Sequence, residues 1–162
     1  MTLLFPKQID NHYRGQWAAL VLFVPVLVIK LLIGINISGL NPMIKPYDIL
    51  QDVDGIPMDS FTTAAAYEIE FATAAWGGAL VIIALFGGLA VVRYRALIPV
   101  AILMLFLEQS WRQVASIMEK MIAGAPLLSS AGAQINLTFS AALLAALVLS
   151  IIPRKGAKSP GR

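Results

Sequence analysis

The chain has 162 residues, of which 59% are apolar and 13% are charged, and its mean hydropathy is +0.80. Soluble domains carry about 45–50% apolar and about 25% charged residues, so this composition excludes a disordered chain and favours an integral membrane protein over a soluble enzyme. The sequence contains no cysteine and a single histidine, His12, which excludes disulfides, thiol catalysis and a site built from several histidines. We expect neither a metal nor a cofactor.

Four apolar runs follow one another along the chain. A helix needs about 20 residues to cross a hydrocarbon core of about 30 Å, and continuous apolar runs favour helices over the alternating strands of a barrel. The first run is too long for the apolar region of a signal peptide and is followed by no small-x-small cleavage site, so we expect it to be retained. The predicted spans are residues 17–35, 61–92, 96–122 and 135–152.

These spans predict the fold class as all-α: a polytopic membrane protein with four transmembrane helices in an antiparallel bundle, forming a single membrane domain over residues 1–162. Basic residues are divided unevenly between its two sides. One side holds eight, and they are Lys7, Arg14, Arg93, Arg95, Arg154, Lys155, Lys158 and Arg162. The other side holds Lys45 and Lys120. By the positive-inside rule we expect both termini in the cytoplasm and outer loops at residues 36–60 and 123–134.

The net charge of +3 then reflects topology and contact with the lipid bilayer rather than nucleic-acid binding. The loop at 36–60 is acidic, and its Asp52-Val53-Asp54-Gly55 fragment resembles the start of a calcium-binding loop. The twelfth position of such a loop requires glutamate, but Thr63 stands there. We therefore expect a solvated turn at this fragment and no metal site.

Ionisable residues inside the predicted spans are the strongest functional signal, because a charge in the hydrocarbon region is costly. From the helical rise, Lys30 and Glu108 both lie about 20 Å above the cytoplasmic interface, and Arg112 lies about 27 Å above it. Glu70 lies about 36 Å up, near the outer interface. Two bases and two acids from three helices are therefore predicted in the outer half of the bundle.

Helical periodicity suggests which of these side chains point inward. Glu108 and Arg112 are four residues apart and share a face, with Gln109 and Gln113 about 100° away on a second polar face. Glu70 shares its face with a stripe of small residues (Thr73, Gly77, Ala84 and Gly88), which lets a neighbouring helix approach closely. Glu68 lies on a different face, toward lipid headgroups or water. The predicted binding residues are Lys30, Glu70, Trp76, Glu108, Gln109, Trp111, Arg112 and Gln113.

Two interpretations of this cluster stay open. The charges can neutralise one another and only specify how the helices pack. Alternatively, the cluster also serves a ligand, a proton or a substrate, since its charged, amide and aromatic groups exceed what packing alone requires. Trp76 and Trp111 have a simpler alternative role as interface anchors or, for Trp76, as part of the core.

Four short motifs connect residues 60–115 with a known group of proteins. They are Glu70-Phe71, the pair Gly77-Gly78, the basic turn and proline between Arg93 and Pro99, and Arg112. In these features the chain resembles an uncharacterised family of small bacterial four-helix membrane proteins. It departs from them in its long acidic outer loop and in Glu108-Gln109. The resemblance implies a four-helix fold in the bacterial inner (plasma) membrane, and it implies no activity.

Two classes of function follow from these features. The first is a non-catalytic membrane protein: an accessory subunit of a larger membrane complex or a homo-oligomer, or a module that binds lipid or an apolar small molecule. The second is a membrane-embedded acid–base enzyme of isomerase, cyclase or hydrolase type acting on an apolar substrate. Its candidate catalytic residues are Glu108 as acid or base, Arg112 as stabiliser of negative charge and Glu70 as second acid.

Overall fold

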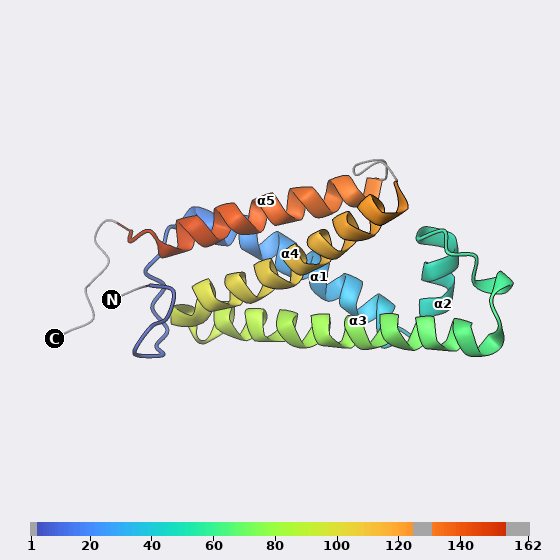
Figure 1. The fold of residues 1–162 in the computed structure, drawn as a ribbon. Coiled ribbons are helices and arrows are strands. Elements are labelled where there is room, and N and C mark those ends of the chain that lie inside the picture. Colours follow the sequence, from blue (N-terminus) through green and yellow to red (C-terminus); the bar gives the residue numbers. More distant parts are fainter. Residues whose placement is uncertain (1–2, 125–130, 155–162) are drawn as a thin grey trace. The chain divides into compact units, whose positions relative to one another are not determined.

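The computed structural model describes residues 3–124 and 131–154, and throughout these residues its regular secondary structure is helical (Figure 1). It contains four long helices, with short helices between the first and second and between the second and third of them. In chain order the elements are α1 (Trp17–Ile37), α2 (Pro46–Asp48), η1 (Ile49–Val53), η2 (Met58–Ser60), α3 (Thr63–Val92), η3 (Arg95–Leu97), α4 (Ile98–Ala123) and α5 (Ala131–Ile151). The predicted all-α class is thereby confirmed.

Three helices are long and apolar enough to cross a membrane. They are α1, α3 and the part of α5 at Gln134–Ile151. Helix α4 covers the third predicted span and has 26 residues, but the polar side chains of its second half lower its mean hydropathy below that of the other three. Length and composition therefore indicate a membrane protein and identify three candidate spans, and α4 is not one of them.

The chain divides into two compact units. Unit 1 contains the described residues of Met1–Leu27 and Phe86–Arg162, and unit 2 is Val28–Leu85. Helices α1 and α3 each contribute one part to unit 1 and the other part to unit 2.

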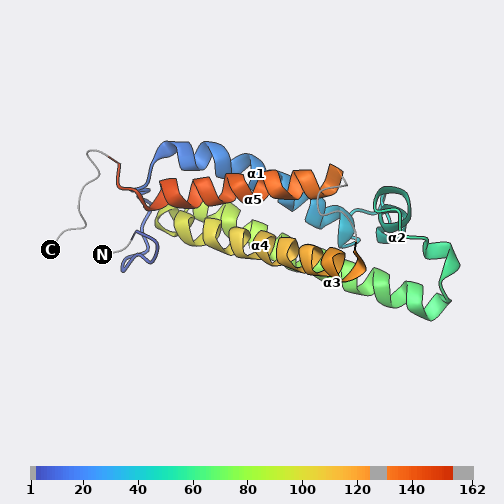
Figure 2. The ribbon, with the colours of Figure 1, turned by 45° about the horizontal axis from the view of Figure 1, so that its top comes forward.

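The core of unit 1 is built on α4 and α5, which follow each other in sequence and lie side by side in both views (Figures 1 and 2). Its buried side chains are aliphatic or aromatic, as expected for helices that are apolar along most of their length. They include Phe23, Ile98, Ile102, Leu105, Leu143 and Ala146. Ser150, near the end of α5, is also buried, and its hydroxyl donates a hydrogen bond to the carbonyl oxygen of Leu147.

In unit 2 the end of α1 lies very close to α3. A Cβ atom built on Gly77 would lie 2.6 Å from Cγ1 of Ile37 and 2.6 Å from the backbone nitrogen of Ser38. A Cβ atom on Gly34 would lie 3.1 Å from the carbonyl oxygen of Gly77. Glycine at these positions allows the two backbones to approach, which is the use that the stripe of small residues predicts for Gly77.

The predicted outer loop is folded into short helices in unit 2. Leu50 and Met58 are almost fully buried, although the loop is acidic and rich in proline and glycine. The backbone nitrogen of Ile56 donates to the carbonyl oxygen of Leu50 at 2.9 Å, across an exposed turn in which Gly55 has φ of 70°. The turn at Asp54-Gly55 is solvated as expected, whereas the residues on either side of it supply a small core.

Candidate functional site

The two sides of α4 differ in polarity, and the polar side is the less exposed one. Among the α4 side chains that the structure describes, the large exposed ones are apolar and recur every three or four residues, at Met104, Leu107, Trp111, Val114, Met118 and Met121. The polar side chains between them are half-buried or buried, and these are Glu108, Gln109, Arg112 and Gln113. An amphipathic helix on the surface of a soluble protein has the opposite arrangement, with its polar side in water.

Gln109 connects α4 to α5. Its side chain is fully buried, and its amide nitrogen Nε2 donates to two oxygens of Asn136, the backbone carbonyl at 3.1 Å and the side-chain Oδ1 at 3.2 Å. Asn136 also accepts a bond on its backbone carbonyl from the hydroxyl of Ser140, at 2.9 Å. The deepest polar group of α4 is therefore used in contact between two helices.

Glu108 and Arg112 lie four residues apart on α4, so their side chains lie on one face of the helix. Both are half-buried, and each takes part in at least one polar or electrostatic interaction. Gln113 is half-buried beside them, whereas Trp111 is 74% exposed on the opposite, apolar side. Among the α4 candidates, Trp111 therefore has the most exposed side chain.

The remaining candidates belong to unit 2. Lys30, on α1, is only 1% exposed, which is unusual for lysine and requires compensation of its charge. Trp76 is half-buried on α3, and both residues take part in at least one hydrogen-bond, ring or electrostatic interaction. Further along α3, Glu70 is half-buried while Glu68 is exposed. Five predicted site residues thus lie in unit 1 and three in unit 2.

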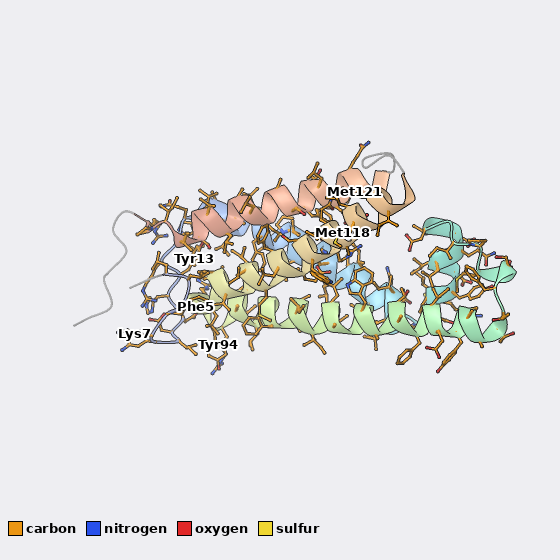
Figure 3. All side chains as sticks on the ribbon, in the orientation of Figure 1. Phe5, Lys7, Tyr13, Tyr94, Met118 and Met121 are labelled. Atoms are coloured by element: carbon orange, nitrogen blue, oxygen red, sulfur yellow. The ribbon has the colours of Figure 1, made fainter. Side chains whose placement is uncertain are left out.

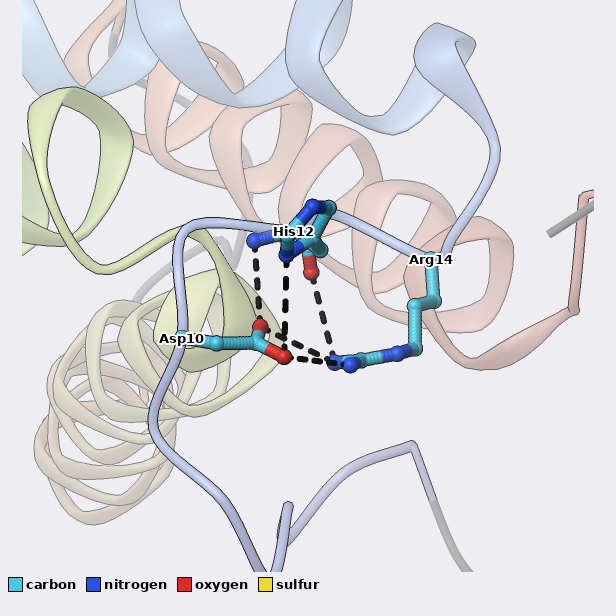
Figure 4. Close-up of polar contacts among 3 residues, drawn as sticks. All are labelled: Asp10, His12 and Arg14. Atoms are coloured by element: carbon cyan, nitrogen blue, oxygen red, sulfur yellow. Dashed lines mark hydrogen bonds and ion pairs between the residues drawn. The ribbon is translucent and has the colours of Figure 1, made fainter. Parts of the chain in front are cut away.

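A cluster at the start of the chain was not among the predicted site residues. Arg14 donates through Nη2 to Oδ2 of Asp10 at 2.5 Å and through Nη1 to Oδ1 at 3.2 Å, and the backbone nitrogen of His12 donates to Oδ1 of Asp10 at 3.0 Å (Figure 4). These bonds, and above all the bond with Arg14, hold the pKa of Asp10 below its usual value. Burial raises the pKa of the neighbouring Tyr13 to about 12.

Hydrogen bonds to backbone carbonyl oxygens attach this first segment to two distant parts of unit 1. The backbone nitrogen of Arg154 donates to the carbonyl oxygen of Arg14 at 2.9 Å, and the side-chain nitrogen of Gln16 donates to the carbonyl oxygen of Pro153 at 2.9 Å. The backbone nitrogen of Ala96, in η3, donates to the carbonyl oxygen of Asp10 at 3.2 Å. The N-terminal segment, the α3–α4 turn and the end of α5 therefore meet at one end of unit 1, which we call the basic end.

A second polar network lies in unit 2, outside the predicted spans. Asp59 accepts hydrogen bonds from the hydroxyl of Tyr47 at 2.5 Å and from Nε2 of Gln51 at 2.8 Å. These bonds lower the pKa of Asp59, and the bond with Asp59 raises the pKa of Tyr47. They tie α2 and η1 to η2. In the part of the chain that the structure describes, no group of three or more His, Asp or Glu side chains is placed to hold a metal ion.

No protein-family model matches the chain, and no curated protein or solved structure is significantly similar to it. The resemblance of residues 60–115 to a family of small bacterial membrane proteins stays a prediction that depends on the residues alone.

Proposed function

We propose that the chain is a bacterial inner-membrane protein with four transmembrane helices and both termini in the cytoplasm. We propose further that it is non-catalytic, acting as an accessory subunit of a membrane complex or as a module that binds lipid or an apolar small molecule. The observation that carries this proposal is the reversed polarity of α4.

Helix α4 supports a fourth span despite its modest hydropathy. The exposed side chains that the structure describes on α4, among them Leu107 and Trp111, are apolar, so hydrocarbon is a favourable solvent for them. Its polar side chains are the less exposed ones, which is how polar groups are arranged inside membrane helices. With 26 residues, α4 is longer than the roughly 20 needed to cross the hydrocarbon core.

The use of Gln109 supports a non-catalytic role. A catalytic side chain must keep its reactive group available to a substrate. The amide nitrogen of Gln109 is instead bonded to Asn136 on the next helix, so this part of the polar side of α4 fixes helix packing. Trp111 and the other exposed apolar side chains of α4 then form the surface on which a lipid, an apolar ligand or a partner helix is accommodated.

The number of spans can be tested by parity. If α4 crosses the membrane, the number of spans is even and both termini lie on the same side. If only α1, α3 and α5 cross, the termini lie on opposite sides. Reporters active in the cytoplasm, fused before Thr2 or after Arg162, should therefore both give signal, as should a periplasm-active reporter inserted near Asp52. A cytoplasmic signal from one terminus only would refute the fourth span.

The molecular role can be tested by extracting the chain from its native membrane in polymer-bounded lipid discs. Mass spectrometry of the intact particle should then find a protein partner or an apolar molecule in fixed ratio to the chain. Trp111→Ala, at an exposed position, should lower that ratio more than Val21→Ala, which changes an exposed residue of α1. A chain recovered alone, which converts an apolar substrate and loses this activity on Glu108→Gln, would support the membrane-embedded enzyme instead.

A further inference from the structure

We propose that the basic end of unit 1 binds the headgroup of an anionic phospholipid through Lys7, Arg93 and Arg95. This inference deepens the proposed function and rests on its placement of the chain in a membrane. It goes beyond the general excess of basic residues on the cytoplasmic side, because it assigns the binding to three exposed side chains that the fold brings to one end of unit 1.

Lys7 and the two arginines belong to segments more than 80 residues apart in sequence, but both segments lie at the basic end. The N-terminal segment is attached to the α3–α4 turn by the hydrogen bond from the backbone nitrogen of Ala96 to the carbonyl oxygen of Asp10, at 3.2 Å. Lys7 and Tyr94 accordingly lie at the same end of unit 1, away from Met118 and Met121 (Figure 3). The side chains of Lys7, Arg93 and Arg95 are all exposed.

The positive charge of this surface is not cancelled by a neighbouring acid. The predicted cytoplasmic segments at residues 1–16, 93–95 and 153–162 contain one acidic residue, Asp10. Both carboxylate oxygens of Asp10 accept hydrogen bonds from Arg14, so its charge is already compensated within the N-terminal segment. Phosphate oxygens are the natural counter-ions for Lys7, Arg93 and Arg95, and guanidinium groups can bind them through two parallel hydrogen bonds.

Apolar side chains among these cations point to a lipid rather than a soluble phosphate or a nucleic acid. Phe5 and Ile9 flank Lys7 in the chain and are each 61% exposed. Arg93 lies 5.9 Å from the ring centroid of Tyr94, and Arg154 lies 5.4 Å from that of Trp17. Aromatic and basic side chains together are typical of the membrane interface, where rings contact acyl chains and cations contact headgroups. A soluble phosphate would leave Phe5 and Ile9 in water.

The test uses the full chain, purified in a neutral detergent and titrated with phosphatidylglycerol or with phosphatidylcholine, with bound lipid counted by native mass spectrometry. A cation near an anionic lipid surface contributes a factor of about five to binding. Arg93→Gln should therefore weaken binding of phosphatidylglycerol about fivefold, and the triple change of Lys7, Arg93 and Arg95 to Gln should weaken it about 100-fold. The unaltered chain should bind phosphatidylcholine more weakly than phosphatidylglycerol, and the substitutions should change the binding of phosphatidylcholine little.

Lys45→Gln is the matched control, because it removes one exposed lysine from unit 2 and should leave both lipids unaffected. Inorganic phosphate at equal concentration should not displace the lipid. Equal binding of the two lipids by the unaltered chain, or undiminished binding of phosphatidylglycerol by the triple variant, would overturn the proposal. Displacement by phosphate would overturn the assignment to a lipid.

Failure of the membrane placement would be recognised separately. The triple variant keeps five of the eight basic residues on the predicted cytoplasmic side, so its topology should be unchanged in the reporter assay described above. A chain with the proposed topology but without preference for the anionic lipid refutes only the headgroup site. A chain whose termini do not report from the cytoplasm refutes the topology on which the site depends.

Discussion

The side-chain nitrogen of Gln109 donates to both the backbone oxygen and the side-chain oxygen of Asn136, 27 residues further along the chain. This pair joins α4 to α5 at a point where Gln109 is fully buried. Among apolar side chains, a bond between amide groups fixes the register of two helices, because sliding either helix would leave buried polar atoms unsatisfied.

Gln109→Leu should reduce the stability of the chain in detergent by about 0.6 kcal/mol and by no more than about 1.7 kcal/mol, the average and the maximum for hydrogen bonds between membrane helices. Gln113→Leu, at a half-buried position of the same helix, should cost less. Thermal unfolding of Gln109→Leu, Asn136→Leu and the double variant completes a double-mutant cycle. We expect the double variant to lose less stability than the sum of the losses of the two single variants. Strictly additive losses would show that the two side chains are not coupled.

Two adjacent glycines of α3 should respond differently to alanine. A Cβ atom at Gly77 would overlap Ile37 and the backbone of Ser38, whereas one at Gly78 would meet no atom within 4 Å. Gly77→Ala should therefore separate α1 from α3 and lower the melting temperature. Gly78→Ala should be neutral or stabilising, because alanine is favoured over glycine in a helix by about 1 kcal/mol. Equal melting temperatures for the two variants would contradict the close approach of α1 to Gly77.

Lys30 and Lys45 form a matched pair of lysines in unit 2, one buried and the other exposed. Lys30→Met should destabilise the chain by about 1–3 kcal/mol, since the group that interacts with Lys30 would lose its partner inside the protein. Lys45→Met should change stability little. Chemical unfolding of the purified chain measures both. If Lys30→Met were more stable than the unaltered chain, the buried lysine would not serve stability, and this result would support a functional role for Lys30.

The bonds to Asp59 make the folded outer segment sensitive to acid. The pKa of Asp59 is lowered in the fold, so its stabilising contribution is present above the unfolded value of 3.8 and is lost as the pH falls through the folded value. Hydrogen-exchange protection of residues 46–60 should therefore decrease below about pH 3.8. Asp59→Asn should flatten this dependence, because the side chain no longer titrates. Asp52→Asn, at an exposed position, should retain the loss of protection at low pH. If both variants lost protection equally at low pH, a group other than Asp59 would be responsible.

The helical class and the long helices could be predicted from sequence because their causes are local. In hydrocarbon every backbone polar group must be satisfied within its own segment, so a continuous apolar run of sufficient length predicts a helix without reference to the rest of the chain. The bounds of the four predicted apolar segments agree with those of the helices α1, α3, α4 and α5 to within about four residues at each end, and three of these helices, α1, α3 and α5, are candidate spans. The folded outer segment was not anticipated, because Leu50 and Met58 are separated by an exposed turn and no short pattern marks them as a core.

The arrangement of the candidate site could be predicted from the sequence only in part. Helical spacing correctly placed Glu108 and Arg112 on one face of α4, since four residues make roughly one turn. It could not identify Asn136 as the acceptor for Gln109, because hydrogen-bonded partners on different helices are related by packing and not by spacing. The same holds for Ala96 and Asp10, whose hydrogen bond assembles the basic end from segments 86 residues apart.

The sequence by itself determined composition, helix positions and the uneven distribution of basic residues, since each depends on residues close together in the chain or on simple counts. Tertiary structure alone decided that Gly77 and not Gly78 lies against a neighbouring backbone, that Gln109 is committed to Asn136, and that the polar side of α4 is the less exposed one. The physical reason is that burial and hydrogen bonding between helices depend on how the helices rotate and approach. That arrangement is set by the packing of many side chains at once, which are far apart in the sequence.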